Sequence, residues 1–236
     1  MTGFGDFGDF GNFGDFDFGG FDMLPGGGGM EETRYMRPRM ATYNEATFVA
    51  YDNAVKLARD LRVTEGMRAD VFLSGNFIFG DFIEAFLTTH MARAERMTIS
   101  TLSLGQDNVD SLQTLMEKGY LGELRLIVSA YFYSHERHNL VPYIYEHLDI
   151  EDRFQFAVAG CHTKTVHFET QGGKKIVIHG SANLRSSGNI EMMTIEENPA
   201  LYDFFDECFT PLIEKYATIR RPVRRRDAWS ALTGDS

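Results

Sequence analysis

Between residues 70 and 218, short apolar runs alternate with amphipathic stretches. The runs are rich in Val, Ile, Leu and Phe, as strands are, and the stretches between them repeat apolar residues at helical spacing. The pattern predicts strands at 71–73, 97–104, 124–133, 153–159, 163–170, 174–179 and 191–196. It predicts helices at 81–95, 108–118, 138–147 and 199–216. Strands that alternate with helices indicate an α/β domain, so we expect a mixed, mostly parallel sheet flanked by helices.

A second segment, residues 31–69, precedes this domain. A run that begins near Asn44 places five apolar residues at about helical spacing: Phe48, Tyr51, Val55, Ala58 and Leu61. This spacing predicts a helical segment that packs on the core of the domain.

Residues 1–30 are of low complexity and consist largely of Gly, Phe and Asp. Phenylalanine recurs at every third position, a period that fits neither a helix nor a half-buried strand: Phe4, Phe7, Phe10, Phe13 and Phe16. Because ordering so much Gly is costly in entropy, we expect this N-terminal segment, called the head below, to be disordered. Two readings of the head stay open. It is either a solvated segment or a row of aromatic side chains that binds a protein partner or another copy of the chain.

The 236-residue chain carries a net charge of −11 at pH 7. This charge argues against broad, non-specific binding to nucleic acid, but it does not exclude a local basic site. Residues 219–236 form a basic tail with five arginines: Arg220, Arg221, Arg224, Arg225 and Arg226. Three readings of the basic tail stay open: a solvated tail, a segment that binds nucleic-acid phosphates, and a partner for the acidic head.

The sequence contains no recognisable secretory signal and no apolar run long enough to cross a bilayer. Its two cysteines, Cys161 and Cys208, lack metal-ligand spacing, and we expect both to be reduced thiols in a cytoplasmic protein. Because no cluster of His, Cys and carboxylate residues has ligand spacing, we expect no metal and no other cofactor.

Candidate chemistry is concentrated between residues 161 and 191. This stretch contains a His-x-Lys pair, a Gly-Ser-x-Asn turn and an Asn-x-Glu sequence that ends at Glu191. In an extended strand His162 and Lys164 would point to the same face, and a nucleophile beside a cation suits attack on a phosphate. The small residues Gly180 and Ser181 would let the backbone approach an oxyanion, and Ser181 and Asn183 add side-chain donors.

Together these motifs resemble the signature of the phospholipase D superfamily, which is His-x-Lys, four residues, Asp, and then Gly-Ser-x-Asn. Glu169 stands where that family has Asp, and the hairpin carries extra residues around 171–174. The predicted order of strands and helices resembles one phospholipase D half-domain over residues 70–216.

The resemblance implies a role for each residue of the motif. His162 would be the nucleophile that forms a covalent phosphohistidine, and Lys164 would neutralise the phosphoryl oxygens. Ser181 and Asn183 would bind the same phosphate, and Glu191 would orient the histidine through its other ring nitrogen. Glu169 would be a structural acid. Because family members with a single motif usually dimerise, the resemblance also implies a homodimer in which two copies of His162 meet.

Three functions follow from this reading. The first is a metal-independent phosphodiesterase, a nuclease or endonuclease that hydrolyses DNA or RNA. The second is a phospholipid phosphodiesterase. The third is a catalytically weak or inactive phospholipase D-like protein that acts in assembly or interaction through its Phe-rich head.

Overall fold

The computed structural model describes residues 40–74, 77–90, 92–185 and 189–218. The predictions for the head, residues 1–30, and for the five arginines of the basic tail lie outside these ranges. Among the described residues, no helix combines the length and the apolar character needed to cross a membrane.

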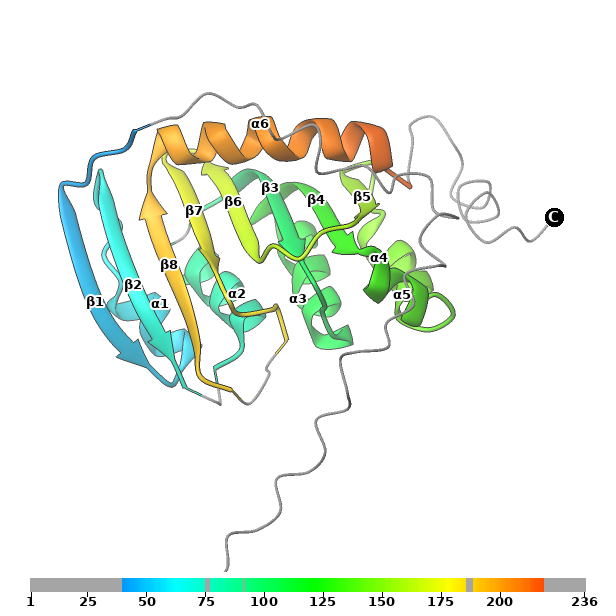
Figure 1. Ribbon diagram of the computed structural model, residues 1–236, viewed down its shortest axis with the longest axis horizontal. Helices are drawn as coiled ribbons and strands as arrows, with labels where there is room; N and C mark the ends of the chain where they lie inside the picture. Colours follow the sequence, from blue (N-terminus) through cyan, green and yellow to red (C-terminus); the bar gives the residue numbers. More distant parts are fainter. Residues whose placement is uncertain (1–39, 75–76, 91, 186–188, 219–236) are drawn as a thin grey trace, which may run out of the picture.

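One sheet of eight strands forms the centre of the fold (Figure 1). Its strands are β1 (Glu45–Tyr51), β2 (Met67–Leu73), β3 (Ala94–Thr101), β4 (Leu121–Ser129), β5 (Phe154–Ala159), β6 (Thr165–Thr170), β7 (Lys175–Gly180) and β8 (Glu191–Glu197). Their spatial order is β1-β2-β8-β7-β6-β3-β4-β5. The pairs β1–β2, β3–β4 and β4–β5 are parallel, and the other pairs are antiparallel.

The predicted mixed sheet is confirmed, but most of its pairings are antiparallel rather than parallel. The reason is the place of the two strands that run against the others. Both β6 and β8 lie in the interior of the sheet, so each of them makes two antiparallel pairings. Their positions follow from the tight β6–β7 hairpin and from the return of the chain to β8 beside β7.

Helices cover both faces of the sheet (Figure 1). They are α1 (Ala54–Asp60), α2 (Phe79–Thr89), α3 (Gln106–Glu117), α4 (Ala130–His135), α5 (Leu140–Leu148) and α6 (Pro199–Tyr216). The larger core lies under α1, α2, α3 and α5, and the smaller core joins α6 to β4 and β5. The predicted bounds of α6 are confirmed; Asn198 caps the helix by accepting from Leu201 N at 3.1 Å, and Pro199 stands in its first turn.

Three predictions about local structure were wrong. The helix expected at 81–95 ends at Thr89, and residues 94 and 95 belong to β3. The expected helix near Asn44 is instead β1, because four of the seven residues at 45–51 are β-branched or aromatic and the segment pairs with β2. Helix α1 begins only at Ala54, where Asn53 caps it. The strand expected at 124–133 ends at Ser129, whose hydroxyl accepts from Phe132 N at 3.0 Å and so starts α4.

A buried histidine joins α6 to the sheet. His167 of β6 is enclosed by helix α6, and its ring stacks on those of Phe205 and Phe209 at centroid distances of 6.1 and 5.8 Å. Neither of its ring nitrogens has a hydrogen-bond partner among the described residues, and Nε2 lies 3.8 Å from Asp206 Oδ1. Burial lowers the pKa of His167, and the charge of Asp206 opposes this shift only in part.

Stability is therefore expected to fall when the pH drops below about 6.5, the ordinary pKa of an unfolded histidine. With its folded pKa lowered, His167 binds fewer protons in the native state than in the unfolded chain, so the free energy of unfolding rises with pH in that window. The limit for one proton is about 1.4 kcal/mol per pH unit. Denaturant unfolding between pH 5 and pH 7.5 measures this slope.

The matched variant is His167→Phe, whose ring stacks between the same aromatic side chains but cannot titrate. Its free energy of unfolding is expected to change less over this pH range than that of the wild type. Equal slopes for the two proteins would contradict the assignment to His167.

Candidate active site

The three motifs meet at one edge of the sheet. This is the edge at which the parallel strands end, toward which the arrows of β1 and β2 point (Figure 1). Because β6 and β8 run in the opposite direction, their first residues lie at this same edge: Thr165 is in register with Ser100, and Glu191 is in register with Leu73. The His-x-Lys pair therefore precedes β6, the Gly-Ser-x-Asn turn follows β7, and Glu191 begins β8.

His162 and Lys164 are in contact, but not for the reason predicted. They lie in the segment before β6, which begins at Thr165, so strand alternation does not place them. Instead, the Lys164 side chain turns back, and its Nζ lies 2.9 Å from both His162 Nδ1 and the His162 carbonyl oxygen. The imidazole is exposed. Because an ammonium group only donates, Nδ1 is the acceptor, and the neutral ring carries its proton on Nε2.

Partial burial lowers the pKa of Lys164, whereas the negative charge of Glu191 acts to raise it. The ammonium group is thus partly stripped of water. A cation in that state attracts a phosphate more strongly than a fully solvated one does.

Ser181 links the Gly-Ser-x-Asn turn to β8. Its hydroxyl donates to the Glu191 carboxylate and accepts from Met192 N at 3.0 Å, while its own N–H donates to Met192 O at 2.9 Å. Glu191 is therefore held between the Ser181 hydroxyl and the charge of Lys164. The contact predicted between Glu191 and His162 stays a prediction, as does phosphate binding by Ser181.

The small size of Gly180 has a structural reason. A Cβ atom at this position would lie 2.1 Å from Met192 O and 2.8 Å from Met193 Cα, both of them backbone atoms of β8. The first residue of the Gly-Ser-x-Asn turn therefore permits the close approach of β7 and β8 that brings Ser181 to Glu191.

Asn183 has an unsatisfied end. Its Oδ1 is buried and has no hydrogen-bond partner within the part of the chain that the structure describes. Ser74, Asn183 and Glu191 line a small hollow together, and Asn183 also faces a larger hollow beside α4. A buried amide with an unpaired end is available to a ligand, and rotating the amide would present its NH₂ group instead.

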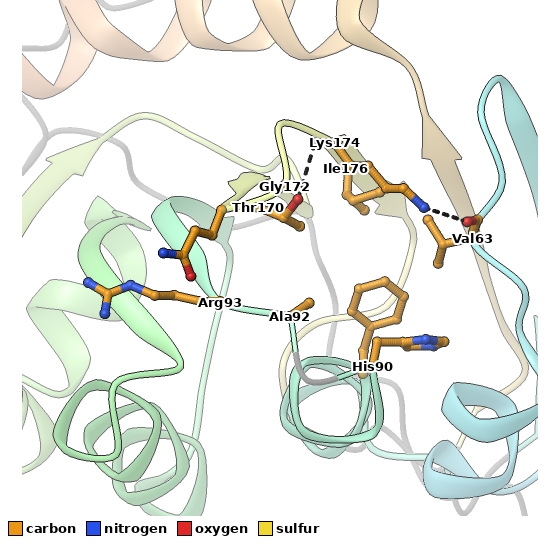
Figure 2. A pocket seen from close by; sticks show the side chains of 10 residues that line it. Val63, His90, Ala92, Arg93, Thr170, Gly172, Lys174 and Ile176 are labelled. Carbon is orange, nitrogen blue, oxygen red and sulfur yellow. Dashed lines mark hydrogen bonds between the residues drawn. The ribbon is translucent and has the colours of Figure 1, made fainter.

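Glu169 and the extra hairpin residues lie at the opposite edge of the sheet. Glu169 is in register with Arg96 and Lys175 at the far end of β6. The hairpin turn there borders a hollow of about 560 Å³, where the Lys174 ammonium donates to the Val63 carbonyl oxygen at 2.8 Å (Figure 2). The lengthened turn therefore leaves the His-x-Lys end of the hairpin undisturbed. Glu169 remains a predicted structural acid.

Two larger hollows also adjoin the motif residues, and sequence reasoning missed both. One, of about 590 Å³, has an apolar wall from α6 and includes His162 and both cysteines; its α6 wall contains Phe204, Phe205, Phe209 and Leu212. The helical spacing of these residues predicts an apolar face on α6, but it does not predict which part of the protein that face lies against. The other, of about 500 Å³, lies between α4 and the Gly-Ser-x-Asn turn and includes Tyr131, His135 and Arg185.

Among the described residues, no group of three or more His, Cys, Asp or Glu side chains is arranged to hold a metal ion. The two remaining histidines near the motif have structural partners. His167 is enclosed under α6, and His179 Nε2 lies 3.2 Å from Glu196 Oε1.

No family model matches the sequence, and no curated protein does. Among solved structures, the chain is similar to a phospholipase D family member, Nuc from Salmonella typhimurium, with 13% identity, TM-score 0.42, and coverage of 52% of this chain and 81% of that one. It is similar to NucT from Helicobacter pylori, with 14% identity, TM-score 0.43, and coverage of 64% and 98%. For polyphosphate kinase from Porphyromonas gingivalis the identity is 11%, the TM-score 0.47, and the coverage 71% and 30%.

At these identities and TM-scores the neighbours carry no argument about this chain, so its chemistry rests on its own residues. Those residues are the exposed His162 with Lys164 against it, and the turn that ties Ser181 to Glu191. The residues of the three motifs are thus gathered at one edge of a mixed sheet of eight strands.

Proposed function

We propose that the protein is a metal-independent phosphodiesterase that hydrolyses nucleic acid through a covalent phosphohistidine at His162. The observation that carries this proposal is the exposed imidazole with the Lys164 ammonium 2.9 Å from its Nδ1. A nucleophile and a partly desolvated cation on one surface suit attack on a phosphodiester, whose equatorial oxygens gain negative charge.

The reaction begins when the substrate phosphate draws the Lys164 ammonium away from Nδ1. Once Nδ1 is free to hold the ring proton, the Nε2 lone pair attacks phosphorus and forms the P–N bond. The P–O bond to the leaving group breaks, and the leaving oxygen takes a proton from a general acid. The general acid, which has given up its proton, then takes a proton from water as the water oxygen attacks phosphorus; the P–N bond breaks, and the imidazole leaves with its electron pair.

That general acid is proposed to be His162 of the partner subunit, because the chain carries a single His-x-Lys motif. A two-fold axis near the exposed edge would bring the two imidazoles to one phosphorus atom. The arginine-rich tail supports a nucleic-acid substrate, since guanidinium groups bind phosphates.

The test is hydrolysis of labelled DNA and RNA, single- and double-stranded, in the presence of EDTA. Turnover is expected to persist, and rapid denaturing quench followed by peptide mapping is expected to place an acid-labile phosphoryl group on His162. Turnover that EDTA abolishes, or a phosphoryl group on another residue, would contradict the proposal.

Dimerisation has its own readout. If two subunits complete each site, specific activity is expected to fall on dilution in parallel with the dimer fraction measured by sedimentation. Full activity from a protein that sediments as a monomer would refute the shared site while leaving the phosphohistidine in place.

A phospholipid phosphodiesterase is the second candidate, favoured by the apolar hollow of about 590 Å³ that includes His162. Such a hollow is large enough for part of an acyl chain. Hydrolysis of phosphatidylcholine vesicles without hydrolysis of DNA or RNA would select this candidate. Absence of activity on both would select the assembly or interaction function.

A further inference from the structure

The hollow between α4 and the Gly-Ser-x-Asn turn is not explained by the chemistry at His162. It has a volume of about 500 Å³, within the usual range for small-ligand sites. It adjoins the proposed phosphate site because Asn183, whose Oδ1 is buried without a partner among the described residues, lies in its wall. A ligand in this hollow would therefore be a neighbour of a phosphate held at His162.

One wall of the hollow is an aromatic platform. Tyr131 is 50% exposed, and its ring packs on the His135 ring with a centroid distance of 3.9 Å and an interplanar angle of 33°. His135 is fixed in this position because its Nδ1 donates to the Tyr131 carbonyl oxygen at 2.8 Å. These two rings, packed on each other at a tilt, offer a planar ligand an aromatic surface on which to stack.

The other walls carry polar groups of both signs. Arg185 is exposed, and its guanidinium group can bind a phosphate. The Glu136 carboxylate, on the α4 side, can accept from the amino group of a base. Aromatic, cationic and carboxylate groups are thus placed where one nucleotide would present its base face, its phosphate and its base edge.

We propose that this hollow binds one unpaired base of a single-stranded nucleic acid, with the base stacked on Tyr131, beside the phosphate held at His162. The inference rests on the proposed function and names its substrate class. In a duplex both faces of each base are covered by neighbouring bases, so only an unpaired base can stack on a side chain. Stacking also compensates for the acidic net charge, which weakens binding that relies on phosphate contacts alone.

The test measures binding by fluorescence anisotropy, using the full chain with His162→Asn to prevent cleavage. The probes are a fluorescein-labelled oligothymidylate and a duplex of the same length. Adding Tyr131→Ala is expected to weaken binding of the single strand about 5- to 140-fold, the range for losing one stacked base, without a matching effect on the duplex. Tyr131→Phe keeps the ring and is expected to bind within about twofold of the parent.

The matched control is Phe48→Ala. Phe48 is another exposed aromatic residue, 80% exposed, but it lies on β1 at the other end of the sheet. It is expected to leave binding of both probes unchanged, and thermal unfolding checks that each variant is folded.

The anisotropy assay measures binding and needs no turnover. Its result can therefore contradict the inference without contradicting the proposed function, and the reverse. Tyr131-dependent binding of the single strand upholds the inference even if no phosphodiester is cleaved. Hydrolysis together with single-strand binding that Tyr131→Ala leaves unchanged overturns the inference alone. Equal losses for single strand and duplex, or no binding of the single strand by the parent, overturn it as well.

Discussion

His162→Asn is expected to lower kcat on a phosphodiester substrate by at least about 10³-fold, because removal of a covalent nucleophile leaves only binding and electrostatic effects. The fold is expected to remain intact, since the side chain is exposed and its contact is the Lys164 ammonium. Steady-state kinetics and denaturant unfolding of the same preparation give both readings.

The control for this prediction is His138→Asn. His138 is also exposed, lies between α4 and α5, and belongs to none of the three motifs. Its replacement is expected to leave kcat within about twofold of the wild type. If His162→Asn retained comparable activity, the phosphohistidine mechanism would be wrong.

The second large effect is expected at Gly180. Gly180→Ala would place a Cβ atom 2.1 Å from Met192 O, so β7 and β8 must separate at the end that carries Ser181. We expect the free energy of unfolding to fall by about 3 kcal/mol and activity to fall with it, since a shift there also moves Ser181 from Glu191. Denaturant unfolding and kinetics of the variant measure the two effects.

Gly172→Ala is the matched substitution for Gly180→Ala. At Gly172, in the hairpin turn, the nearest atom to a new Cβ is Thr170 Oγ1 at 3.8 Å, an ordinary contact. Its effect is expected to stay within about 0.5 kcal/mol. Equal stabilities for the two variants would show that the strands yield at Gly180 at little energetic cost.

The elements predicted best are those that have their start, end and periodicity marked in the local sequence. Helix α6 has its predicted bounds because Asn198 and Pro199 mark its start and its apolar spacing is regular. Residues 45–51 were wrongly predicted as helix because the spacing of their apolar residues also fits a helix. Parallel pairing with β2 makes this segment a strand, and that pairing is a tertiary contact that the local sequence does not contain.

The site was predicted as a set of residues but not as a set of contacts. Motif spacing predicted His162, Lys164, Ser181 and Glu191 as site residues, and the structure places them at one edge of the sheet. Strand alternation wrongly explained the first pair, and the bond from Ser181 to Glu191 depends on the β7–β8 register. Tyr131 and His135 lie about 50 residues before Asn183 in the sequence. They come next to the turn because β4 and β7 end at the same edge of the sheet, where α4 follows β4 and the turn follows β7.

The buried His167 has a consequence for kinetic work on this protein. It anchors α6, and the same helix supplies the apolar wall beside His162. Protonating His167 in acid would loosen that wall, so an acidic limb in the pH–rate profile of the proposed reaction would have a conformational source as well as a catalytic one. Repeating the profile with His167→Phe separates them: the part of the limb that disappears belongs to the helix anchor, and the part that stays belongs to the reacting groups.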